Sequence, residues 1–320
     1  MPTKEDLKAL QSESLERKVR ITQTRIIEWY KHYNGQVYVS FSGGKDSTVL
    51  LHLARLCFPD IEAVFIDTGL EYPEIRDFVK TFDNVTWLKP EMRFDEVISK
   101  YGYPIISKNV SQIIYEYRKN PKCAIVKHFD NESDYIKKYG QRFSLAKYIP
   151  LRDSDIPISH LCCHVMKKKP AKKFEKASGK MPILGTMADE SQLRKASWMK
   201  NGCNAFNSKR PISQPMSFWT EQDVLHYLEL TGLPYASVYG EIIPIAEFEG
   251  QMALNTMVKL KTTKCQRTGC VFCGFGAHLE KEPNRFQMLK ETHPKMYDYC
   301  IREENGLGMG KVLDYIGVKY

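Results

Sequence analysis

The sequence lacks the features of several specialised protein classes. It has no apolar run long enough to cross a bilayer, no internal repeat and no low-complexity segment. These absences exclude a membrane-spanning chain and give no sign of a repeat architecture. Residues 1–20 are predicted to form a charged helix and not an apolar signal peptide. We therefore expect a cytoplasmic globular protein with no membrane partner.

The remaining composition is that of an ordinary folded chain with two notable counts. The 320 residues are 42% hydrophobic and 27% charged, which is enough for one large domain or two moderate ones. The net charge of +9 allows a polyanionic partner such as nucleic acid, although runs such as Lys167–Lys169 fit a solvated helix face equally well. The nine cysteines of a cytosolic chain indicate metal ligands or reactive thiols and not disulfides.

The most informative segment is the loop Ser-Phe-Ser-Gly-Gly-Lys-Asp-Ser at residues 40–47, between an apolar strand and an apolar helix. Gly43 and Gly44 allow a sharp turn and a close approach of the backbone to a ligand. Amide groups at the start of the following helix then face an anion, and the helix dipole favours it. The spacing is not that of a Walker A loop. The loop therefore predicts a phosphate cradle, in which Lys45, Ser42 and Ser47 donate and either Asp46 or Ser47 caps the helix.

Strands and helices alternate along the chain and predict an α/β fold. This alternation is typical of a parallel sheet with helices on both faces, in which ligands bind at the carboxyl ends of the strands. The loop at 40–47 and the loop that begins at Asp67 would both lie at that edge. We expect residues 107–160, which are polar, basic and rich in aromatics, to insert into the site or cover it. The predicted strands are 36–41, 61–66, 84–88 and 182–186, and the predicted helices are 4–32, 46–57, 73–79, 94–101 and one from Ser191.

The cysteines of the second half form a separate constellation. Cys162 and Cys163 are adjacent, and Cys265-x4-Cys270-x2-Cys273 and then Cys300 follow. A Cys-x2-Cys turn directs two thiolates at one metal or cluster. The last four of these cysteines imitate the plant-type ferredoxin spacing. From spacing alone, an iron–sulfur cluster, a structural zinc and unligated buried thiols all stay open.

Several segments in order resemble one known family. Ser40 to Ala54 and Phe65 to Glu74, which contains Asp-Thr-Gly, look like the phosphoadenosine phosphosulfate reductase family within the PP-loop ATP pyrophosphatases. The further matching segments are Cys162-Cys163-x4-Lys168-x-Pro170, Gly185-Thr186-x3-Glu190-Ser191-x2-Arg194, Trp219-Thr220-x2-Asp223-Val224, Leu233-Pro234-Tyr235 and Gly269-Cys270-x2-Cys273.

This resemblance implies a Rossmann-like nucleotide-binding domain with a cysteine-rich C-terminal lobe. We expect an N-terminal helical segment at 1–34, the PP-loop domain at 35–230 and the iron–sulfur lobe at 231–320. The resemblance further implies a 4Fe–4S cluster on Cys162, Cys163, Cys270 and Cys273, with Cys265 as an alternative to Cys162. It implies that Lys45, Ser47 and Arg194 are catalytic. Lys108 is a weaker candidate than Arg194 for a clamp on phosphate or acceptor. The residues expected to bind ATP with Mg²⁺ are Ser40, Ser42, Gly43, Gly44, Lys45, Asp46, Ser47, Asp67, Thr68 and Gly185.

The chain departs from the reductases of that family in two ways. Reductases attack the sulfonucleotide with a cysteine near the C-terminus, and residues 306–320 contain none. Their loop is degraded, whereas the loop here is complete. We therefore expect an ATP pyrophosphatase that adenylates an acceptor for sulfur transfer, with DNA or tRNA as acceptor and a cysteine desulfurase as donor. The alternatives are a sulfonucleotide reductase that uses Cys265 or Cys300, and an ATP-sensing module that binds nucleic acid.

Overall fold

The computed structural model describes residues 2–245 and 258–320, which divide into two compact units. Unit 1 draws on residues 1–67, 71–89 and 171–268, and unit 2 on residues 68–70, 90–170 and 269–320. The boundaries that we predicted at residues 34 and 230 do not coincide with these units. The physical reason is that the N-terminal helices pack into the core of unit 1, while residues 90–170 fold together with the C-terminal segment.

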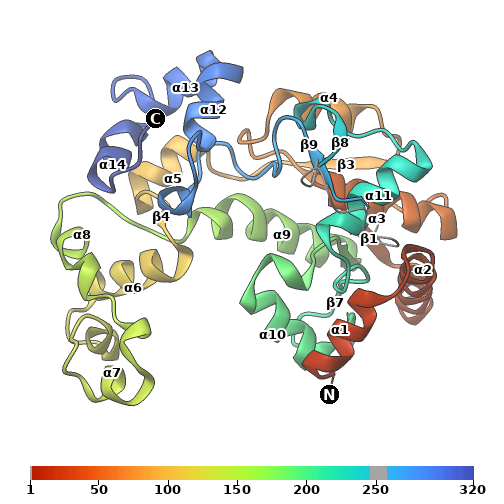
Figure 1. Ribbon diagram of the computed structural model, residues 1–320, viewed down its shortest axis with the longest axis horizontal. Helices are drawn as coiled ribbons and strands as arrows, with labels where there is room; N and C mark the ends of the chain where they lie inside the picture. Colours follow the sequence, from red (N-terminus) through yellow and green to blue (C-terminus); the bar gives the residue numbers. More distant parts are fainter. Residues whose placement is uncertain (1, 246–257) are drawn as a thin grey trace, which may run out of the picture. The chain divides into compact units, whose positions relative to one another are not determined.

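Unit 1 is built on a six-stranded sheet in the order β3-β2-β1-β5-β7-β6. Strands β1, β3 and β7 of this sheet are labelled in Figure 1. Strand β1 pairs in parallel with β2 and β5, while β6 runs antiparallel to β7 at the edge. The parallel Rossmann-like sheet predicted from the alternation of elements is confirmed. The strands are β1 (Val37–Ser40), β2 (Ala63–Ile66), β3 (Val85–Leu88), β5 (Met181–Leu184), β6 (Asn204–Ala205) and β7 (Ile212–Ser213).

Helices cover the sheet because its central strands are apolar on both faces. In β1, Val37, Tyr38 and Val39 are all buried, as expected of a strand inside a parallel sheet. The helices α2 (Leu15–His32) and α11 (Glu221–Thr231) both pack against α3 (Lys45–Cys57). The other helices of unit 1 are α1 (Lys4–Ser12), α4 (Pro73–Lys80), α9 (Lys169–Ser178, which begins in unit 2) and α10 (Gln192–Asn201), and β8 (Ile242–Pro244) pairs with β9 (Leu260–Thr262).

The N-terminal helix is interrupted, contrary to the single helix predicted over 4–32. Glu13 is extended, with φ −64° and ψ 155°, and ends α1. The Ser14 side chain then accepts a hydrogen bond from the Arg17 amide at 3.3 Å and so caps α2. The apolar periodicity continues through the break, which is why the pattern alone did not show it.

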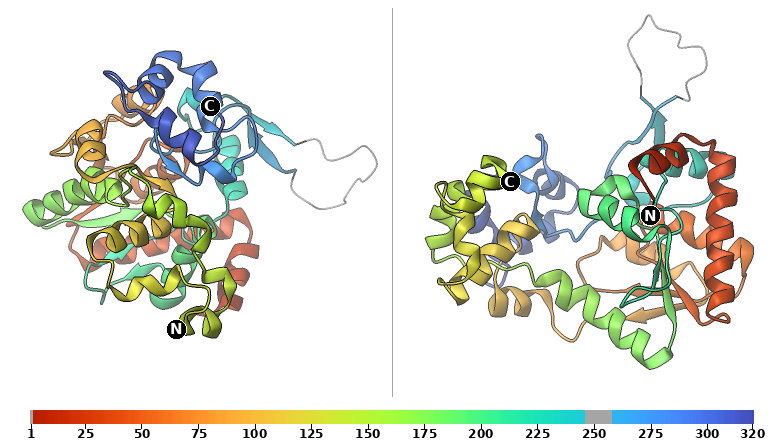
Figure 2. Two further views of the ribbon diagram at one scale, coloured as in Figure 1. Left: turned by 90° about the vertical axis from the view of Figure 1, so that its left-hand side faces the viewer. Right: turned by 90° about the horizontal axis from the view of Figure 1, so that it is seen from below.

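Unit 2 is mainly helical, with one short parallel pair between β4 (Ile105–Ile106) and β10 (Gly274–Phe275). This pair joins the first part of the unit to its C-terminal part, which is blue in Figure 2. The segment 107–160 contains helices, and the Arg118 guanidinium ties it together by donating to four backbone carbonyls between Leu151 and Ile156. The helices are α5 (Phe94–Tyr101), α6 (Lys108–Lys119), α7 (Asp134–Tyr139), α8 (Ile149–Asp153), α12 (Arg285–Thr292), α13 (Pro294–Ile301) and α14 (Met309–Tyr315).

The described helices also bear on the membrane question raised by the sequence. Over residues 2–245 and 258–320, none of them combines the length and the apolar character that a bilayer crossing requires.

Candidate functional site

The predicted phosphate loop lies in unit 1 between β1 and α3 and makes the sharp turn that its glycines suggested. Gly43 has φ +70°, a backbone conformation that favours glycine. A Cβ atom at this position would lie 2.7 Å from Val79 Cγ2 and 2.8 Å from Ile75 Cγ2, both on α4. Gly43 is therefore required by conformation and by the close approach of a neighbouring helix.

Helix α3 begins at Lys45, and no side chain caps it. Its N-cap is Gly44, so the prediction that Asp46 or Ser47 caps the helix is wrong. The reason is that Ser47 already lies in the first turn, where its hydroxyl donates to the Gly44 carbonyl at 2.9 Å. The same hydroxyl accepts from the Ser42 amide at 3.1 Å and lies 2.9 Å from Ser42 Oγ. Ser47 thus holds the loop closed and leaves the helix start without a side-chain cap, as an anion site requires.

Lys45 is almost fully buried, and protein groups hold its charge in place. Its Nζ donates to the Gln266 carbonyl at 2.7 Å and lies 3.0 Å from a carboxylate oxygen of Glu221. The ammonium also lies 5.3 Å from the centre of the Tyr239 ring. The side chain of Lys45 is only 4% exposed, against 43% for Glu221. The lysine is therefore held at the loop, and an anionic ligand would compete with Glu221 for its charge.

The segment 265–268 completes the surroundings of the loop, and sequence reasoning missed it. The Lys45 amide donates to the Tyr239 hydroxyl at 3.1 Å, and that hydroxyl lies 2.7 Å from Thr268 Oγ1. Burial raises the pKa of Tyr239, which keeps the phenol protonated. Tyr239, Thr268 and Gln266 were not predicted. The sequence signals near them, the Leu233-Pro234-Tyr235 segment and the cysteine spacing from Cys265, do not indicate contacts with the loop.

Asp46 carries the most unusual polar atom of the loop. Its Oδ1 is buried and accepts no hydrogen bond within the described residues. Burial raises the pKa of this carboxyl, while the positive charges of Lys45, Arg267 and Arg194 oppose the rise. A buried carboxylate oxygen without a donor has the chemistry of a ligand for a hard cation such as Mg²⁺, and the neighbouring cations suit the phosphates that would carry the ion. The residues of the loop therefore fit a magnesium nucleotide.

Of the other predicted site residues of unit 1, Ser40, Asp67 and Gly185 lie at strand ends and Arg194 lies on α10. A Cβ atom on Gly185, which follows β5, would lie 3.3 Å from the Asp46 carbonyl, so this glycine allows the strand end to approach the loop. Asp67 is paired with Arg76 at 2.8 Å. Arg194 is paired with Glu190 one turn away, and burial together with the charge of Arg267 lowers its pKa. Ser40 ends β1.

Thr68 and Lys108 belong to unit 2, unlike the loop. The Thr68 hydroxyl accepts from the Leu70 amide at 3.2 Å, which shapes the turn after Asp67. Lys108 is exposed at the first position of α6, and its charge lowers the pKa of Cys163. The weaker candidate Lys108 is thus associated with the cysteines.

Cys162 and Cys163 form a coupled thiol pair in unit 2. The Cys162 thiol donates to Cys163 Sγ over 3.9 Å. This hydrogen bond, with the charges of Lys108 and of the lysines at 167 and 168, lowers the pKa of Cys163 to about 6. The same hydrogen bond and burial raise the pKa of Cys162. Cys163 is therefore the member of the pair that ionises first, as a thiolate ligand must.

Cys270 and Cys273 lie in the same unit and act electrostatically on that pair. Both raise the pKa of Cys162, and the Cys273 amide closes the turn by donating to the Cys270 carbonyl at 3.1 Å. Within the described residues, however, no group of three or more His, Cys, Asp or Glu side chains is arranged to hold a metal ion. The fold brings the four predicted ligands into one unit, and the cluster itself stays a prediction.

The two remaining candidate thiols differ from this set in the unit to which they belong or in their burial. Cys265 belongs to unit 1, where its thiol donates to the Arg267 carbonyl at 3.1 Å. Cys300 on α13 is fully buried, and burial raises its pKa to about 12. A buried thiol with a raised pKa is a weaker nucleophile than an exposed one. The burial of Cys300 therefore disfavours it as the relocated nucleophile, and that role stays a prediction.

Together, the parallel strands and the flanking helices define an α/β domain with a Rossmann-like sheet, and the loop lies at the end of β1. The profile described as "Phosphoadenosine phosphosulfate reductase domain" matches residues 36–145 and 97–274, which together cover most of the chain. The chain belongs to the phosphoadenosine phosphosulfate reductase family, as its motifs suggested.

This chain spans different shares of the lengths of its individual relatives. An uncharacterized protein of Methanocaldococcus jannaschii is 35% identical over 138 residues, which is 42% of this chain and only 30% of that protein. An adenosine 5'-phosphosulfate reductase of Staphylococcus haemolyticus is 25% identical over 221 residues, 68% of this chain and 72% of that enzyme. A phosphoadenylyl-sulfate reductase structure from Candida auris, a phosphate complex, matches with TM-score 0.39 and 16% identity over 74% of this chain and 91% of that one.

Proposed function

We propose that the chain binds ATP with Mg²⁺ at the loop of residues 40–47 and transfers the adenylyl group to an acceptor, which is thereby activated for sulfur transfer. The observation that carries this proposal is the buried, unpartnered Oδ1 of Asp46 next to the complete loop. Such an oxygen can hold the magnesium ion of a triphosphate, whereas attack of a thiolate on a sulfonucleotide uses no metal. The protein residue that would hold Mg²⁺ is Asp46, and the ion would neutralise charge on the phosphates.

The protein groups of the loop have separate roles in this reaction. The amides at the start of α3 and the ammonium of Lys45 would stabilise the phosphate oxygens. Ser47 would keep the loop in shape through its bonds to Gly44 and Ser42. Arg194 would add a second positive charge. An acceptor oxygen attacks the α-phosphorus, its proton passes to solvent, the α–β phosphoanhydride bond breaks, and pyrophosphate leaves with the electron pair.

The cysteines of unit 2 would serve the second half of the reaction. Cys162, Cys163, Cys270 and Cys273 would hold a 4Fe–4S cluster, which supplies a site for sulfur or a rigid staple when bound. The low pKa of Cys163 supports its part as a thiolate ligand. The persulfide of a cysteine desulfurase would then attack the activated acceptor and AMP would leave. Two thiols would reduce the resulting S–S bond and be oxidised to a disulfide, which leaves the sulfur on the acceptor and frees the desulfurase thiol.

A second candidate, sulfonucleotide reduction, is better supported by the relatives, since several of them are named adenosine 5'-phosphosulfate reductases. Because Cys300 is fully buried, Cys265 is the better candidate for the nucleophile of this reaction. Cys265 is half-buried and is the first residue of the segment 265–268. Its thiolate would attack the sulfur of adenylyl sulfate, AMP would leave, and an S-sulfocysteine would form. An external thiol would then release sulfite and be oxidised to a disulfide with Cys265, which a further thiol reduces.

The two candidates release different products, so one assay separates them. The protein, purified without oxygen, is incubated with ATP, Mg²⁺ and tRNA, DNA or sulfate, and pyrophosphate is measured. Sulfite is measured in parallel with adenylyl sulfate, its 3′-phosphorylated form and a thiol reductant. We expect pyrophosphate with one acceptor and no sulfite. Sulfite without pyrophosphate, or ATP binding without turnover on any acceptor, would contradict the proposal, the latter in favour of a nucleotide-sensing module.

The variant Lys45→Ala tests whether pyrophosphate release depends on the loop. Because the Lys45 ammonium is buried at the phosphate site, its loss should lower pyrophosphate release by about 100-fold or more. Lys80→Ala is the matched control, since Lys80 is a 62% exposed lysine that pairs with Asp77 on the surface of α4. Full pyrophosphate release by Lys45→Ala would show that the loop is not the site.

A further inference from the structure

Four aromatic rings gather at the surface of unit 2, in the segment between α6 and α8. We call His128, Tyr135, Tyr139 and Phe143 the aromatic cluster. The Tyr135 ring centre lies 4.6 Å from that of His128, 4.9 Å from that of Tyr139 and 6.3 Å from that of Phe143. Tyr139 and Phe143 are 49% and 38% exposed, so large ring faces are open to solvent.

The aromatic cluster is not the interior of this segment. Other side chains fill that role, namely Phe129, Ile136 and Leu145, which are 5%, 1% and 9% exposed. A small helical segment that already has its own buried side chains does not need four further rings at its surface. Exposed aromatic groups of this kind mark a binding surface more often than a packing need.

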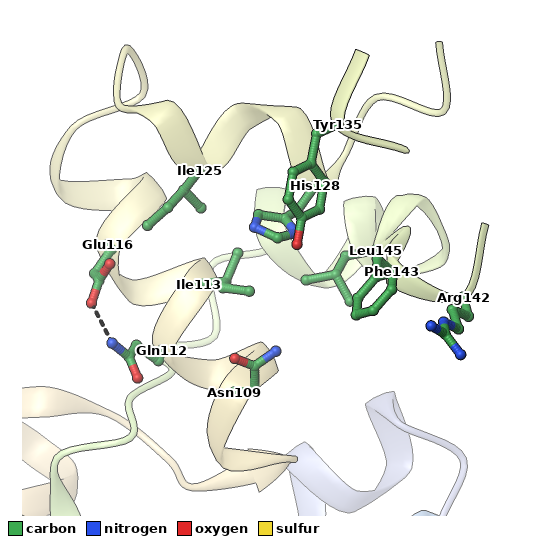
Figure 3. A pocket seen from close by; sticks show the side chains of 10 residues that line it. All are labelled: Asn109, Gln112, Ile113, Glu116, Ile125, His128, Tyr135, Arg142, Phe143 and Leu145. Atoms are coloured by element: carbon green, nitrogen blue, oxygen red, sulfur yellow. Dashed lines mark hydrogen bonds between the residues drawn. The ribbon is translucent and has the colours of Figure 1, made fainter. Parts of the chain in front are cut away.

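A pocket of about 430 Å³ opens between the aromatic cluster and α6 (Figure 3). His128 and Tyr135 lie on one side of it, and Asn109, Gln112 and Glu116 of α6 lie on the other. Gln112 donates to Glu116 at 2.7 Å, so the two polar side chains are held in a defined position. The pocket therefore combines ring faces with amide and carboxylate groups that can read the edge of a planar heterocycle.

Cations surround the same rings. Lys127 Nζ lies 4.5 Å from the centre of the Tyr135 ring, and the Arg142 guanidinium lies 4.9 Å from that of Phe143. Lys138 Nζ lies 5.4 Å from the centre of the Tyr139 ring. Between Lys108 and Tyr148 the sequence contains nine Lys or Arg and four Asp or Glu. The ligand that complements this surface is planar, heterocyclic and polyanionic.

We propose that residues 108–148 form a binding site for single-stranded nucleic acid, with one unpaired base in the pocket and adjacent bases stacked on Tyr139 and Phe143. Aromatic rings interleaved with Lys and Arg are the usual means of holding a single strand, since the rings stack with bases and the cations contact phosphates. A duplex hides its base faces and could use only the charges. The choice between RNA and DNA depends on the 2′-hydroxyl, which the test varies.

This site goes beyond the proposed function, because binding requires neither ATP nor the cysteines. If the proposed adenylation takes place, the acceptor belongs to the class of single-stranded nucleic acids. The two proposals can fail separately: Lys45→Ala should lose pyrophosphate release and keep strand binding, whereas loss of the aromatic cluster should weaken binding in the absence of any nucleotide.

The test measures fluorescence anisotropy of labelled 12-nucleotide strands with the full-length protein, using uridine, adenosine, thymidine and deoxyadenosine homopolymers and a 12-base-pair duplex. We expect single strands to bind more tightly than the duplex. Tyr139→Ala combined with Phe143→Ala should weaken single-strand binding about 10-fold or more. Arg142→Gln should reduce the slope of log affinity against log salt by about 0.7.

A matched control comes from a ring and cation pair elsewhere in unit 2. Lys290 Nζ lies 5.2 Å from the centre of the Tyr297 ring, and Tyr297→Ala should leave binding unchanged. Phe143→Tyr should keep binding, because it preserves the ring face. If the alanine variants fail to fold, quenching of 2-aminopurine in a strand bound to the unmodified protein reports stacking directly. Equal binding of duplex and single strand, unchanged binding by the double alanine variant or unquenched 2-aminopurine would overturn the proposal.

Discussion

The phosphate loop of unit 1 and the cysteine set of unit 2 are ordered to different degrees by contacts within the protein. Around the loop, hydrogen bonds at 2.7–3.1 Å fix Lys45, Ser47 and Tyr239 before any ligand binds. In the cysteine set, one long thiol contact of 3.9 Å is present, and the described residues contain no arrangement ready for a metal ion. A phosphate site can be formed by the chain alone, whereas a cluster site depends on the cluster for its final geometry.

The largest effect is expected when Asp46 in the phosphate loop is replaced. Asp46→Asn removes the carboxylate that would hold Mg²⁺, and we expect a loss of pyrophosphate release of about 100-fold. The protein should nevertheless become more stable at pH 8, by about 1 kcal/mol, because the variant removes a negative charge that burial disfavours. A steady-state assay and denaturant unfolding measure the two effects.

The stability gain of Asp46→Asn has a defined pH dependence. Burial raises the folded-state pKa of this carboxyl above its ordinary value of 3.8. The native state therefore holds the proton more tightly than the unfolded chain, and the cost of the charged form grows as the pH rises above 3.8. The gain should be largest at neutral and alkaline pH and vanish toward pH 4. A gain that increased on acidification would contradict this account.

Gly43→Ala tests whether the loop requires the positive φ and the missing Cβ atom of this glycine. The new Cβ would meet Val79 and Ile75 at 2.7 and 2.8 Å, at a positive φ of +70°. We expect a loss of about 2–3 kcal/mol in the free energy of unfolding. Gly44→Ala is the control, since Gly44 has φ −77° and its nearest neighbours at 3.1 Å are the side-chain hydroxyls of Thr268 and Tyr239. Equal losses in both variants would show that the conformation of Gly43 does not matter.

Two cysteine variants test the proposed cluster ligands of unit 2. Cys163→Ser should abolish iron and sulfide binding with little effect on the free energy of unfolding of the metal-free protein. Cys300→Ser should keep iron and cost about 1–3 kcal/mol, because a hydroxyl would be placed at a fully buried position. Iron and sulfide counts after anaerobic purification, with denaturant unfolding, separate the two. Zinc in place of iron, or iron retained by Cys163→Ser, would disprove the cluster assignment.

The smallest effect is expected from Glu221→Gln. The Glu221 carboxylate lies 3.0 Å from Lys45 Nζ and competes with phosphate for that charge. Because Glu221 is 43% exposed, its hold on the lysine is modest, and we expect nucleotide affinity to rise about 3-fold. Glu229→Gln on the same helix is the matched control. Weaker nucleotide binding by Glu221→Gln would mean that Glu221 orients Lys45 and does not compete for it.

The sequence predicted the parallel sheet and the loop well because both are local patterns. A buried apolar strand, a glycine pair and a helix within twenty residues define the turn at Gly43 without help from elsewhere. The partners of Lys45 could not be predicted, because Tyr239 and Gln266 are about two hundred residues away and carry no motif of their own. The break at Glu13 was missed for a different reason, since a capping serine inside a continuous apolar pattern is a weak signal.

The central claim, that the loop is a site for magnesium ATP, is tested most directly by calorimetric titration of the metal-free protein. ATP should bind with 1:1 stoichiometry when Mg²⁺ is present, more than 10-fold more weakly without it, and not measurably to Lys45→Ala. Adenylyl sulfate binding that is tighter than that of ATP and indifferent to Mg²⁺ would contradict the claim and make this protein a sulfonucleotide enzyme.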